Sequence, residues 1–400
     1  MTISEKMKVL RILNRFNVGG PVYNATYLTK YLNNFETMLV GGVHESHEQS
    51  ADYILINEGV DFKKLKYMRR AISPIYDFIT LFQLIIILYK FNPKIIHTHA
   101  AKAGLLGRIA KLFYFKKVYV VHTYHGNVFE GYFSDFKNKI ILKIERFLAR
   151  YSTKIVSISQ LQKKDLVNKY KICDSNKITV VPLGFDLKRF TKQLDQKRTK
   201  TRTEFLIKNN ELCITIIGRV VPIKNHKLFI DVFDFCKKNS TKKIKALVVG
   251  DGNDTEDIIS YSKTKNLEVT YKSPSGNEDV VFASWRSDID NILAASDIVC
   301  LTSINEGTPV SIIESMASAT ASISTNVGGV CDIITNNETG NVACGDLLDY
   351  GTKLLKLIED ETYRQEVALA GQIKSLSTFN YTNLVDNIEN LYFKIINDEN

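Results

Sequence analysis

The chain has 400 residues, of which 44% are hydrophobic and 24% charged, and its formal net charge is +10 at pH 7. That length favours two domains, and seven prolines with no long polar tract argue against extended disorder. The six cysteines are scattered without a C-x-x-C pair, which argues against a disulfide framework and suits a reducing cytoplasm.

The charge is uneven along the chain. Residues 1–190 hold 30 Lys and Arg against 14 Asp and Glu, which gives +16, whereas the rest of the chain carries −6. A basic first half indicates an anionic partner, either nucleic acid or an anionic membrane surface. A solvated, lysine-rich surface is the alternative interpretation.

Two apolar features bear on localisation. The first residues have no long apolar run and no cleavage signature, so we expect no signal peptide. Phe78–Tyr89 is uncharged but too short to span a bilayer, and Asp77 and Lys90 bound it. We therefore expect this stretch to form a buried core helix.

Apolar, strand-like runs alternate with helical patterns along the whole chain, which predicts two tandem α/β units with parallel strands. The first unit is expected to contain the strands Val9–Phe16, Thr37–Val43, Lys94–His99, Val118–His122, Lys154–Ile158 and Ile178–Val181. The second is expected to contain Leu212–Gly218, Lys245–Gly250, Leu267–Tyr271, Asp297–Leu301, Ala321–Thr325 and Asn341–Ala343. The predicted helices include Val22–Leu32, Asn138–Arg150, Asn225–Lys237, Val310–Ala319 and Tyr381–Ile396.

The polar run Thr191–Thr203 separates the two units and is interpreted as a linker or a surface helix. Open α/β sheets bind ligands at the carboxyl ends of their strands. The default active site is therefore a cleft between the two domains.

Glycines and histidines follow the strands of the first unit. Gly19 and Gly20 end the first strand and leave room for a phosphate or sugar, although a tight turn needs glycine too. Five of the seven histidines lie in His97–Gly104 and Val121–Gly126. Neutral histidine can donate to sugar hydroxyls or transfer a proton, and Gly126 gives access to His125. No cysteine or H-E-x-x-H pattern supports a zinc site there.

Strand ends of the second unit carry charged and glycine-rich turns. Arg219 and Lys224 project from the loop Gly218–Asn225, where an arginine fork, a lysine and a helix start suit a diphosphate. Gly250 gives the backbone room for a ligand, and Arg286, beside Trp285, fits a nucleobase pocket. The alternatives are a basic surface loop, a plain strand–helix turn, and a helix cap formed by Asp288.

The segment Asn305–Glu314 follows a strand expected to be buried and enters a helix. Thr308 is the predicted N-cap and Pro309 the first helical residue. Glu306 then lies on the loop and Glu314 about one turn inside the helix. Two carboxylates, a glycine and free helix amides suit a sugar joined to a nucleotide diphosphate. A capped helix with two surface glutamates is the alternative.

Taken together, these ordered segments resemble the retaining glycosyltransferases of family 4, and the likeness covers nearly the whole chain. It rests on nine segments: Asn17–Pro21, His97–Gly107, His122–Phe133, Val181–Phe190, Gly218–Asn225, Val249–Gly252, Trp285–Asp288, Glu306–Glu314 and Asn326–Val330. The resemblance implies a GT-B fold, with two Rossmann-like domains facing each other across a central cleft. It implies a first domain of residues 1–190 joined by a crossing C-terminal helix of 378–400, and a donor domain of residues 191–377.

The resemblance also implies roles for individual residues. Arg219 and Lys224 match the donor-diphosphate clamp, Glu306 would contact the donor sugar, and Glu314 would bind ribose hydroxyls. The donor-side set is completed by Gly19, Gly20, Gly250, Arg286, Gly307, Thr308 and Val310. The catalytic set is His125, Arg219, Lys224 and Glu306. The acceptor-side set is His99, Lys102 and Tyr124.

Within the family, His97–Phe133 looks like members that build surface polysaccharides, capsules, lipopolysaccharide or lipid-linked oligosaccharides. A UDP-sugar donor, a glycan or polyprenyl-diphosphate acceptor and no metal or other cofactor are therefore expected. The basic first half would contact the inner face of the cell membrane from the cytoplasm, and no nucleic acid partner is expected. The candidate membrane contacts are Lys63, Lys64, Lys66, Arg69 and Arg70.

Rival classes remain open from the sequence. A nucleotide-sugar epimerase or hydrolase of similar fold would consume donor without acceptor. A basic nucleic-acid-binding protein accounts for the charge, but the sequence holds no recognised nucleic-acid motif. A Rossmann dehydrogenase is disfavoured because no G-x-G-x-x-G follows the first strand. Retention through a covalent nucleophile and same-face attack cannot be told apart.

Overall fold

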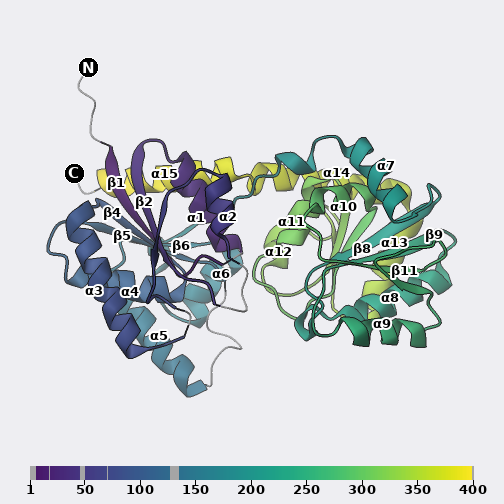
Figure 1. The fold of residues 1–400 in the computed structure, drawn as a ribbon, viewed down its shortest axis with the longest axis horizontal. Coiled ribbons are helices and arrows are strands. Elements are labelled where there is room, and N and C mark those ends of the chain that lie inside the picture. The colour runs from purple at the N-terminus through teal and green to yellow at the C-terminus, as the bar shows by residue number, and fades with distance from the viewer. Residues whose placement is uncertain (1–5, 18, 46–49, 70, 127–134, 399–400) are drawn as a thin grey trace. The chain divides into compact units, whose positions relative to one another are not determined.

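The computed structural model describes residues 6–17, 19–45, 50–69, 71–126 and 135–398. The chain folds as two compact units. Unit 1 comprises Met1–Phe185 together with Phe379–Asn400, and unit 2 comprises Asp186–Thr378. Each unit is a parallel β-sheet covered by helices on both faces (Figure 1), which confirms the predicted two-domain α/β class.

The described residues of unit 1 form a seven-stranded sheet in the order β3-β2-β1-β4-β5-β6-β7. All neighbouring strands are parallel, so their carboxyl ends meet at one edge. The strands are β1 (Met7–Leu13), β2 (Phe35–Gly42), β3 (Phe62–Leu65), β4 (Ile95–His99), β5 (Tyr119–Tyr124), β6 (Lys154–Ser157) and β7 (Ile178–Val180).

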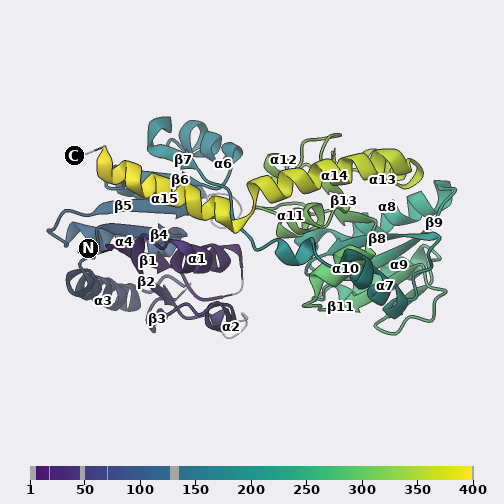
Figure 2. The ribbon, with the colours of Figure 1, turned by 90° about the horizontal axis from the view of Figure 1, so that it is seen from above.

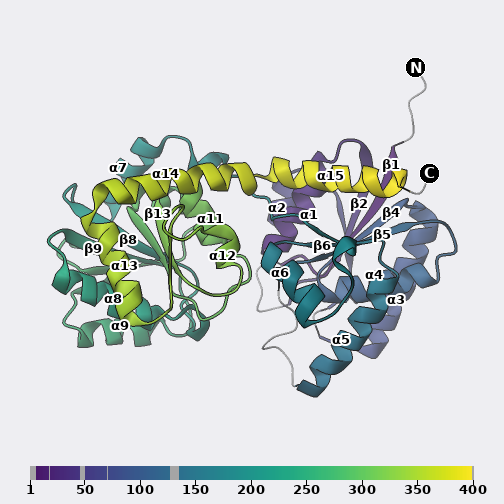
Figure 3. The same ribbon diagram turned by 180° about the vertical axis from the view of Figure 1, so that it is seen from behind.

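Helices cover this sheet in two layers. One face carries α1 and α15, and the other carries α3, α4 and α5 (Figures 1 and 3). The α-helices of unit 1 are α1 (Gly20–Tyr31), α2 (Asp52–Asn57), α3 (Pro74–Phe91), α4 (Ala101–Leu112), α5 (Asp135–Arg150), α6 (Gln160–Lys164) and α15 (Tyr381–Asn397). Two shorter helical turns are η1 (Asp165–Lys169) and η2 (Ser175–Lys177).

The C-terminal helix α15 belongs to unit 1, as predicted. Its apolar side packs on the sheet beside α1, and Figure 2 shows the two helices side by side. The rings of Tyr31 and Tyr381 stack with their centroids 4.7 Å apart. At the start of the helix, the Phe185 amide donates to the Phe379 carbonyl. The last segment of the chain therefore completes the core of the first sheet.

Helix α3 is not the buried core helix that the apolar stretch predicts. Only its inner side is buried, through Thr80, Leu84, Ile87, Leu88 and Phe91. Among the described residues it is the one helix that is long and apolar enough to cross a membrane by length and composition. The prediction was wrong because α3 is apolar on its outer side as well.

The described residues of unit 2 form a second seven-stranded parallel sheet, in the order β10-β11-β9-β8-β12-β13-β14. Strands β8 and β12 lie side by side at the centre of this sheet, and the loops that follow them carry Arg219 and Glu306. The strands are β8 (Glu211–Ile217), β9 (Lys243–Val249), β10 (Val269–Tyr271), β11 (Val280–Ser284), β12 (Ile298–Leu301), β13 (Ala321–Thr325) and β14 (Asn341–Ala343).

Helices again cover both faces of this sheet (Figure 3). The largest core cluster lies where α8 and α13 pack on its central strands. The α-helices are α7 (Leu194–Glu204), α8 (His226–Asn239), α9 (Thr255–Thr264), α10 (Ile289–Ala295), α11 (Val310–Ala317), α12 (Val330–Ile333), α13 (Leu347–Glu359) and α14 (Glu361–Thr378). Two 3-10 turns are η3 (Lys188–Phe190) and η4 (Pro222–Lys224).

Two strands were absent from the sequence prediction. Strand β3 is a short edge strand that carries Lys63 and Lys64, so it lacks the apolar pattern of a buried strand. Strand β11 follows β10 without an intervening helix, and the expected alternation of strands and helices passes over it. Both strands are nonetheless parallel to their neighbours.

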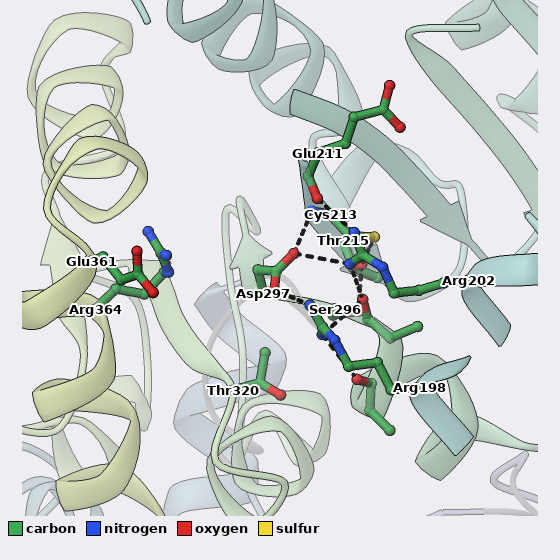
Figure 4. Close-up of polar contacts among 12 residues, drawn as sticks. Arg198, Arg202, Glu211, Cys213, Thr215, Ser296, Asp297, Thr320, Glu361 and Arg364 are labelled. Carbon is green, nitrogen blue, oxygen red and sulfur yellow. Dashed lines mark hydrogen bonds and ion pairs between the residues drawn. The ribbon is translucent and has the colours of Figure 1, made fainter. Parts of the chain in front are cut away.

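The segment read as a linker or surface helix is the helix α7 of unit 2. Figure 4 shows Arg198 and Arg202 of this helix converging on Asp297, which precedes β12. Arg198 Nη2 lies 2.7 Å and Arg202 Nη1 3.2 Å from the Asp297 carboxylate. The Cys213 amide donates to the same carboxylate at 2.7 Å. Two ion pairs and a backbone hydrogen bond thus fasten α7 to β8 and β12.

We expect Asp297→Ala to lower the free energy of unfolding of unit 2 by about 3 kcal/mol, because it leaves the largely buried Arg202 without its carboxylate. The measurement is urea denaturation followed by the fluorescence of Trp285, the single tryptophan, which lies in unit 2. The exposed Glu361→Ala is the control and should cost less than about 1 kcal/mol. Equal losses in both variants would contradict the fastening role of Asp297.

Candidate functional site

The loop that follows β8 presents two basic side chains. Arg219 is exposed, and within the described part of the chain its guanidinium has no ion-pair partner. Lys224 ends the 3-10 turn η4, and its alkyl chain passes over Gly218. Asn225 adopts a left-handed conformation and its side chain accepts from the Leu228 amide, which confirms it as the N-cap of α8. The loop therefore holds an exposed cation beside a capped helix start.

Lys224 meets Glu306 directly. Its ammonium forms an ion pair with Glu306 Oε1, and Ser303 Oγ donates to the same oxygen at 2.6 Å. The Thr302 hydroxyl donates to the Lys224 carbonyl at 3.1 Å, which ties the loop after β12 to the loop after β8. These contacts arise because β8 and β12 are neighbours in a parallel sheet. One carboxylate and one ammonium thus share a site at the carboxyl edge of unit 2.

Helix α11 begins one residue later than predicted. Its N-cap is Pro309 rather than Thr308, and the cap forms no side-chain hydrogen bond. The first helical residues are Val310 and Ser311, whose amides have no acceptor within the helix. Free amides at a helix start attract anions.

Glu314 lies inside α11 and is mostly buried. Burial raises the pKa of its carboxyl to about 7, and the nearby Arg189 guanidinium offsets only part of this rise. Arg189 Nη2 lies 3.5 Å from Glu314 Oε1 and is half exposed. A carboxylate with so little solvation is ready to accept hydrogen bonds from ligand hydroxyls.

Three glycines let the backbones of neighbouring loops in unit 2 come into direct contact. A Cβ on Gly250 would lie 1.9 Å from the Gly218 carbonyl oxygen, and one on Gly252 would lie 2.2 Å from that of Val220. A Cβ on Gly328 would lie 1.7 Å from the Glu306 carbonyl oxygen, and the φ of Gly328 is +50°. Internal packing therefore requires Gly250, so ligand access is not needed to explain it.

Other glycines have no such internal reason. A Cβ on Gly307 would meet no heavy atom within 4 Å, and the same holds for Gly126. At Gly19 and Gly20 an added Cβ would make only ordinary contacts at 3.7 Å. These four positions leave open space beside the backbone, which a ligand can use.

The Arg286 guanidinium is held by two carboxylates. It pairs with Glu204 and, at 2.7 Å, with Asp288, and these hydrogen bonds raise its pKa. Asp288 precedes α10, but its side chain makes no capping hydrogen bond. Trp285, the adjacent residue, is exposed. The charge of Arg286 is thus balanced within unit 2.

Four histidines of unit 1 are gathered at the ends of β4 and β5, because these strands are neighbours. His99 Nδ1 and His125 Nε2 lie 2.8 Å apart, and His97 stacks on His99 with ring centroids 4.2 Å apart. His97 also bonds the Tyr392 hydroxyl of α15 at 2.6 Å and the Thr123 hydroxyl at 2.7 Å. His125 therefore belongs to a row of stacked, hydrogen-bonded imidazoles.

Burial keeps these imidazoles neutral. It lowers the pKa of His125 to about 4 and holds the pKa values of His97 and His99 well below their usual range. The buried Arg11 guanidinium adds to the effect at His97. A neutral His125 can accept a proton or donate a hydrogen bond, as its neighbour His99 fixes only one of its two ring nitrogens.

The other side chains predicted on the acceptor side make internal contacts. The Tyr124 hydroxyl lies in the core and donates to Glu145 Oε2 at 2.6 Å. Lys102 pairs with Asp77 at 2.6 Å and so ties the start of α4 to the start of α3. His99 is buried in the histidine row. Each of the three has a partner that accounts for its position.

Family models match both units. Residues 25–189 match the model described as Glycosyltransferase Family 4, and residues 197–373 match the one described as Glycosyl transferases group 1. Over 329 residues the chain is 30% identical to the UDP-Gal:alpha-D-GlcNAc-diphosphoundecaprenol alpha-1,3-galactosyltransferase of Escherichia coli, covering 82% of each chain. The chain belongs to glycosyltransferase family 4.

Further similarities agree with this assignment. The glycosyltransferase is 27% identical over 330 residues to the capsular polysaccharide biosynthesis glycosyltransferase CapM of Staphylococcus aureus, covering 81% of this chain and 83% of the other. The crystal structure of Anabaena HepE in complex with UDP superposes with a TM-score of 0.80 at 17% identity, covering 97% of this chain and 100% of that one. The two-unit architecture is thus the GT-B fold, as the sequence predicts.

Sequence reasoning about this glycosyltransferase missed three contributors to the site in unit 2. Ser303 holds Glu306, Arg189 faces Glu314, and Gly328 admits the backbone of Glu306. Gly328 and Arg189 lie within two of the segments that carry the family resemblance, Asn326–Val330 and Val181–Phe190, but neither was singled out as a site residue. Ser303 gave no signal, because a hydroxyl three residues before a glutamate is common.

The stability of the glycosyltransferase should depend on pH through Glu314. Its pKa is about 7 in the folded protein against 4.5 unperturbed, so the folded state binds the proton more tightly and stability falls as pH rises from about 4.5 to 7. Relative to wild type, Glu314→Gln should gain on the order of 2–3 kcal/mol between pH 4 and pH 8. Arg189→Gln should enlarge the wild-type loss. Parallel stability–pH curves for wild type and Glu314→Gln, measured by urea denaturation, would refute this.

The two kinds of glycine should respond differently to alanine. Gly328→Ala should lower the free energy of unfolding by about 2 kcal/mol or more, since the methyl group collides with the Glu306 carbonyl at a positive φ. Gly307→Ala should change it by less than about 0.5 kcal/mol, because the methyl group points into open space. Similar losses in both variants, measured by denaturation, would contradict the open space at Gly307.

Proposed function

We propose that this glycosyltransferase moves a hexose from a UDP-sugar to a polyprenyl-diphosphate-linked or glycan acceptor, with retention at the anomeric carbon. The observation that carries the proposal is the pairing of Lys224 with Glu306 beside the exposed Arg219 at the carboxyl edge of unit 2. The E. coli relative is named for a UDP-galactose donor and a diphosphoundecaprenol-linked acceptor, and the S. aureus relative for capsular polysaccharide biosynthesis.

The donor diphosphate would be bound by cations and amides. Arg219 would supply a fork of N–H donors, and Lys224 a point charge. The free amides of Val310 and Ser311 would hold further phosphate oxygens. As the glycosidic bond breaks, negative charge grows on the leaving diphosphate, and these preorganised groups would stabilise it.

The two glutamates would bind the rest of the donor. Glu306 would accept hydrogen bonds from sugar hydroxyls. The hydroxyl of Ser303, which donates to Glu306 Oε1, would keep the carboxylate in position. Glu314 would accept from the ribose hydroxyls, which replace the solvation that burial removes. A diphosphate next to Lys224 would compete with Glu306 for the ammonium, so donor binding would loosen that ion pair.

We propose that no divalent metal takes part in this reaction. Lys224 and Arg219 supply positive charge where a metal would otherwise neutralise the diphosphate. His125, whose burial keeps it neutral, would donate to a sugar hydroxyl or accept a proton. The family resemblance favours same-face attack, assisted by the leaving phosphate, over a covalent nucleophile.

The acceptor would be bound through unit 1, at the cytoplasmic face of the cell membrane. The +16 charge of residues 1–190 supports contact with anionic lipid. Of the predicted contacts, Lys63, Lys66 and Arg69 are exposed. Lys64 is paired with Asp52, and Arg70 lies outside the described residues.

Nucleotide binding tests the donor site. UDP and UDP-sugars should raise the melting temperature of the wild-type protein, because ligands that bind the native state stabilise it by mass action. The shift should disappear in Arg219→Ala and remain in the control Lys272→Ala, an exposed residue after β10. A shift with GDP species alone would overturn the choice of UDP, and no shift with any nucleotide would overturn the donor site.

Turnover tests the chemistry. Arg219→Ala and Lys224→Ala should each lower kcat at least about tenfold, with the melting temperature of the free protein little changed. A chelator should leave the wild-type rate unchanged. Transfer to a lipid-linked acceptor would be followed by chromatography, with the anomeric configuration of the product read by NMR. Donor consumption without an acceptor would favour a hydrolase, and loss of rate with chelator would overturn metal independence.

A further inference from the structure

Helix α3 exposes a continuous apolar stripe. Ile75, Phe78, Phe82, Ile86 and Tyr89 recur at intervals of three and four residues, which places them on one side of the helix. Phe78 is 69% and Phe82 60% exposed, although fully buried aromatic side chains are the norm for a core helix. The opposite side of α3 packs on the sheet, so the helix cannot cross a bilayer without leaving the fold.

The neighbouring helices extend this stripe. The Tyr89 hydroxyl donates to the Phe113 carbonyl at 3.1 Å, so the end of α3 lies beside the end of α4. Phe115 follows there and is 87% exposed. The next helix on the same side of the sheet is α5 (Figures 1 and 3). It has its own stripe of exposed apolar side chains. Its members are Ile140, Ile144, Phe147 and, just after the helix, Tyr151.

Together the outward sides of α3, α4 and α5, with the segment that follows α4, form what we term the three-helix face. It concentrates the exposed apolar side chains of the molecule. Of the 24 large apolar side chains exposed among the described residues, 11 lie on α3, just after α4, on α5 or, just after α5, at Tyr151. Exposed apolar residues scattered singly need no explanation, but a contiguous face of them marks a binding surface.

Basic residues run through and around this face. Residues 74–151 contain 12 Lys and Arg against 4 Asp and Glu, a net charge of +8. Two of these acids are already neutralised inside the fold, Asp77 by Lys102 and Glu145 by Arg108. On α5 the exposed Lys139 and Lys143 alternate with the apolar stripe. The face therefore combines apolar side chains with uncompensated positive charge.

This combination selects one kind of partner. A second copy of the chain in a two-fold dimer would set this positively charged face against the same positively charged face, which is repulsive. A bilayer with anionic headgroups offers both complements at once, an apolar interior for the aromatic side chains and negative charge for the lysines.

We propose that the three-helix face docks this protein on an anionic membrane, with α3 lying in the plane of the headgroups. This inference rests on the proposed function, in which the acceptor is carried by a membrane lipid. It assigns the contact to aromatic and aliphatic side chains of α3 and α5, supported by their lysines, rather than to the basic cluster at residues 63–69 alone.

Vesicle co-sedimentation of the full chain tests the proposal. The protein should sediment with vesicles of equal parts phosphatidylglycerol and phosphatidylcholine, and at least tenfold less with phosphatidylcholine alone. The double variant Phe78→Ser, Phe82→Ser should bind the anionic vesicles at least tenfold more weakly. The matched control Leu369→Ser, Ile373→Ser removes a similarly exposed pair from α14 of unit 2 and should bind like wild type. Lys139→Glu, Lys143→Glu should also weaken binding.

A fluorescence measurement locates the contact. Phe82→Trp adds a second indole to Trp285, and brominated phosphatidylglycerol should quench its emission well beyond the quenching of wild type, whose one indole lies in unit 2. Vesicle binding without such quenching, or unchanged binding by the Phe78, Phe82 double variant, would overturn the proposal. A wild-type dimer in sedimentation velocity that this double variant dissociates, with no vesicle binding, would replace it by self-association.

The UDP-induced rise in melting temperature is recorded for the same samples. It should be retained in the Phe78, Phe82 double variant, because the substituted side chains lie in unit 1 and are exposed. If wild type binds vesicles but shows no shift with UDP, the donor site fails and the docking face stands. If wild type shows the shift but does not bind vesicles, the docking face fails and the donor site stands.

Discussion

The close approach of loop backbones at the carboxyl edge of unit 2 is the constraint on which its site depends. Gly250 admits the loop that carries Arg219, and Gly328 admits the loop that carries Glu306. A Cβ at either glycine would collide with a carbonyl oxygen of the neighbouring loop, so the loops would have to move apart. Because the loops come from neighbouring parallel strands, their contact also brings Lys224 within reach of Glu306.

The charged side chains at this edge are largely paired with one another. Lys224 neutralises Glu306, while Arg189 only partly compensates Glu314. The exposed Arg219 has no such partner among the described residues. In the proposed function, the diphosphate of a nucleotide sugar would meet Arg219 and share Lys224 with Glu306, and its ribose hydroxyls would meet the poorly solvated carboxylate of Glu314. The Lys224–Glu306 ion pair limits the cost of burying these two charges. Arg219 and the carboxylate of Glu314 keep the capacity to bind further polar groups.

Unit 1 combines a buried polar cluster within its apolar core with a set of exposed apolar side chains. Its buried layer holds the histidine row, Arg11 and Tyr392, which burial and mutual hydrogen bonds keep in one arrangement. Through Tyr392 the C-terminal helix contacts the same strand ends that position His125. The outward sides of α3 and α5 invert the usual pattern of a surface helix. If the two proposals hold, the ligand-contacting His125 and the membrane-docking face would belong to the same unit.

The return of the last helix to unit 1 was implied by the family resemblance. Local patterns in the sequence determined the alternation of strands and helices and the loops that carry Arg219, Lys224 and Glu306. These follow from periodicity and from strand ends, which depend on neighbours along the chain. Only the tertiary structure decided which apolar face of α3 is covered, that α7 is fastened to Asp297, that Tyr124 is internal, and why Gly250 and Gly328 must be glycines. Each of these depends on segments distant in sequence, and an apolar or glycine residue has the same local pattern whether its partner is the protein itself or something outside it.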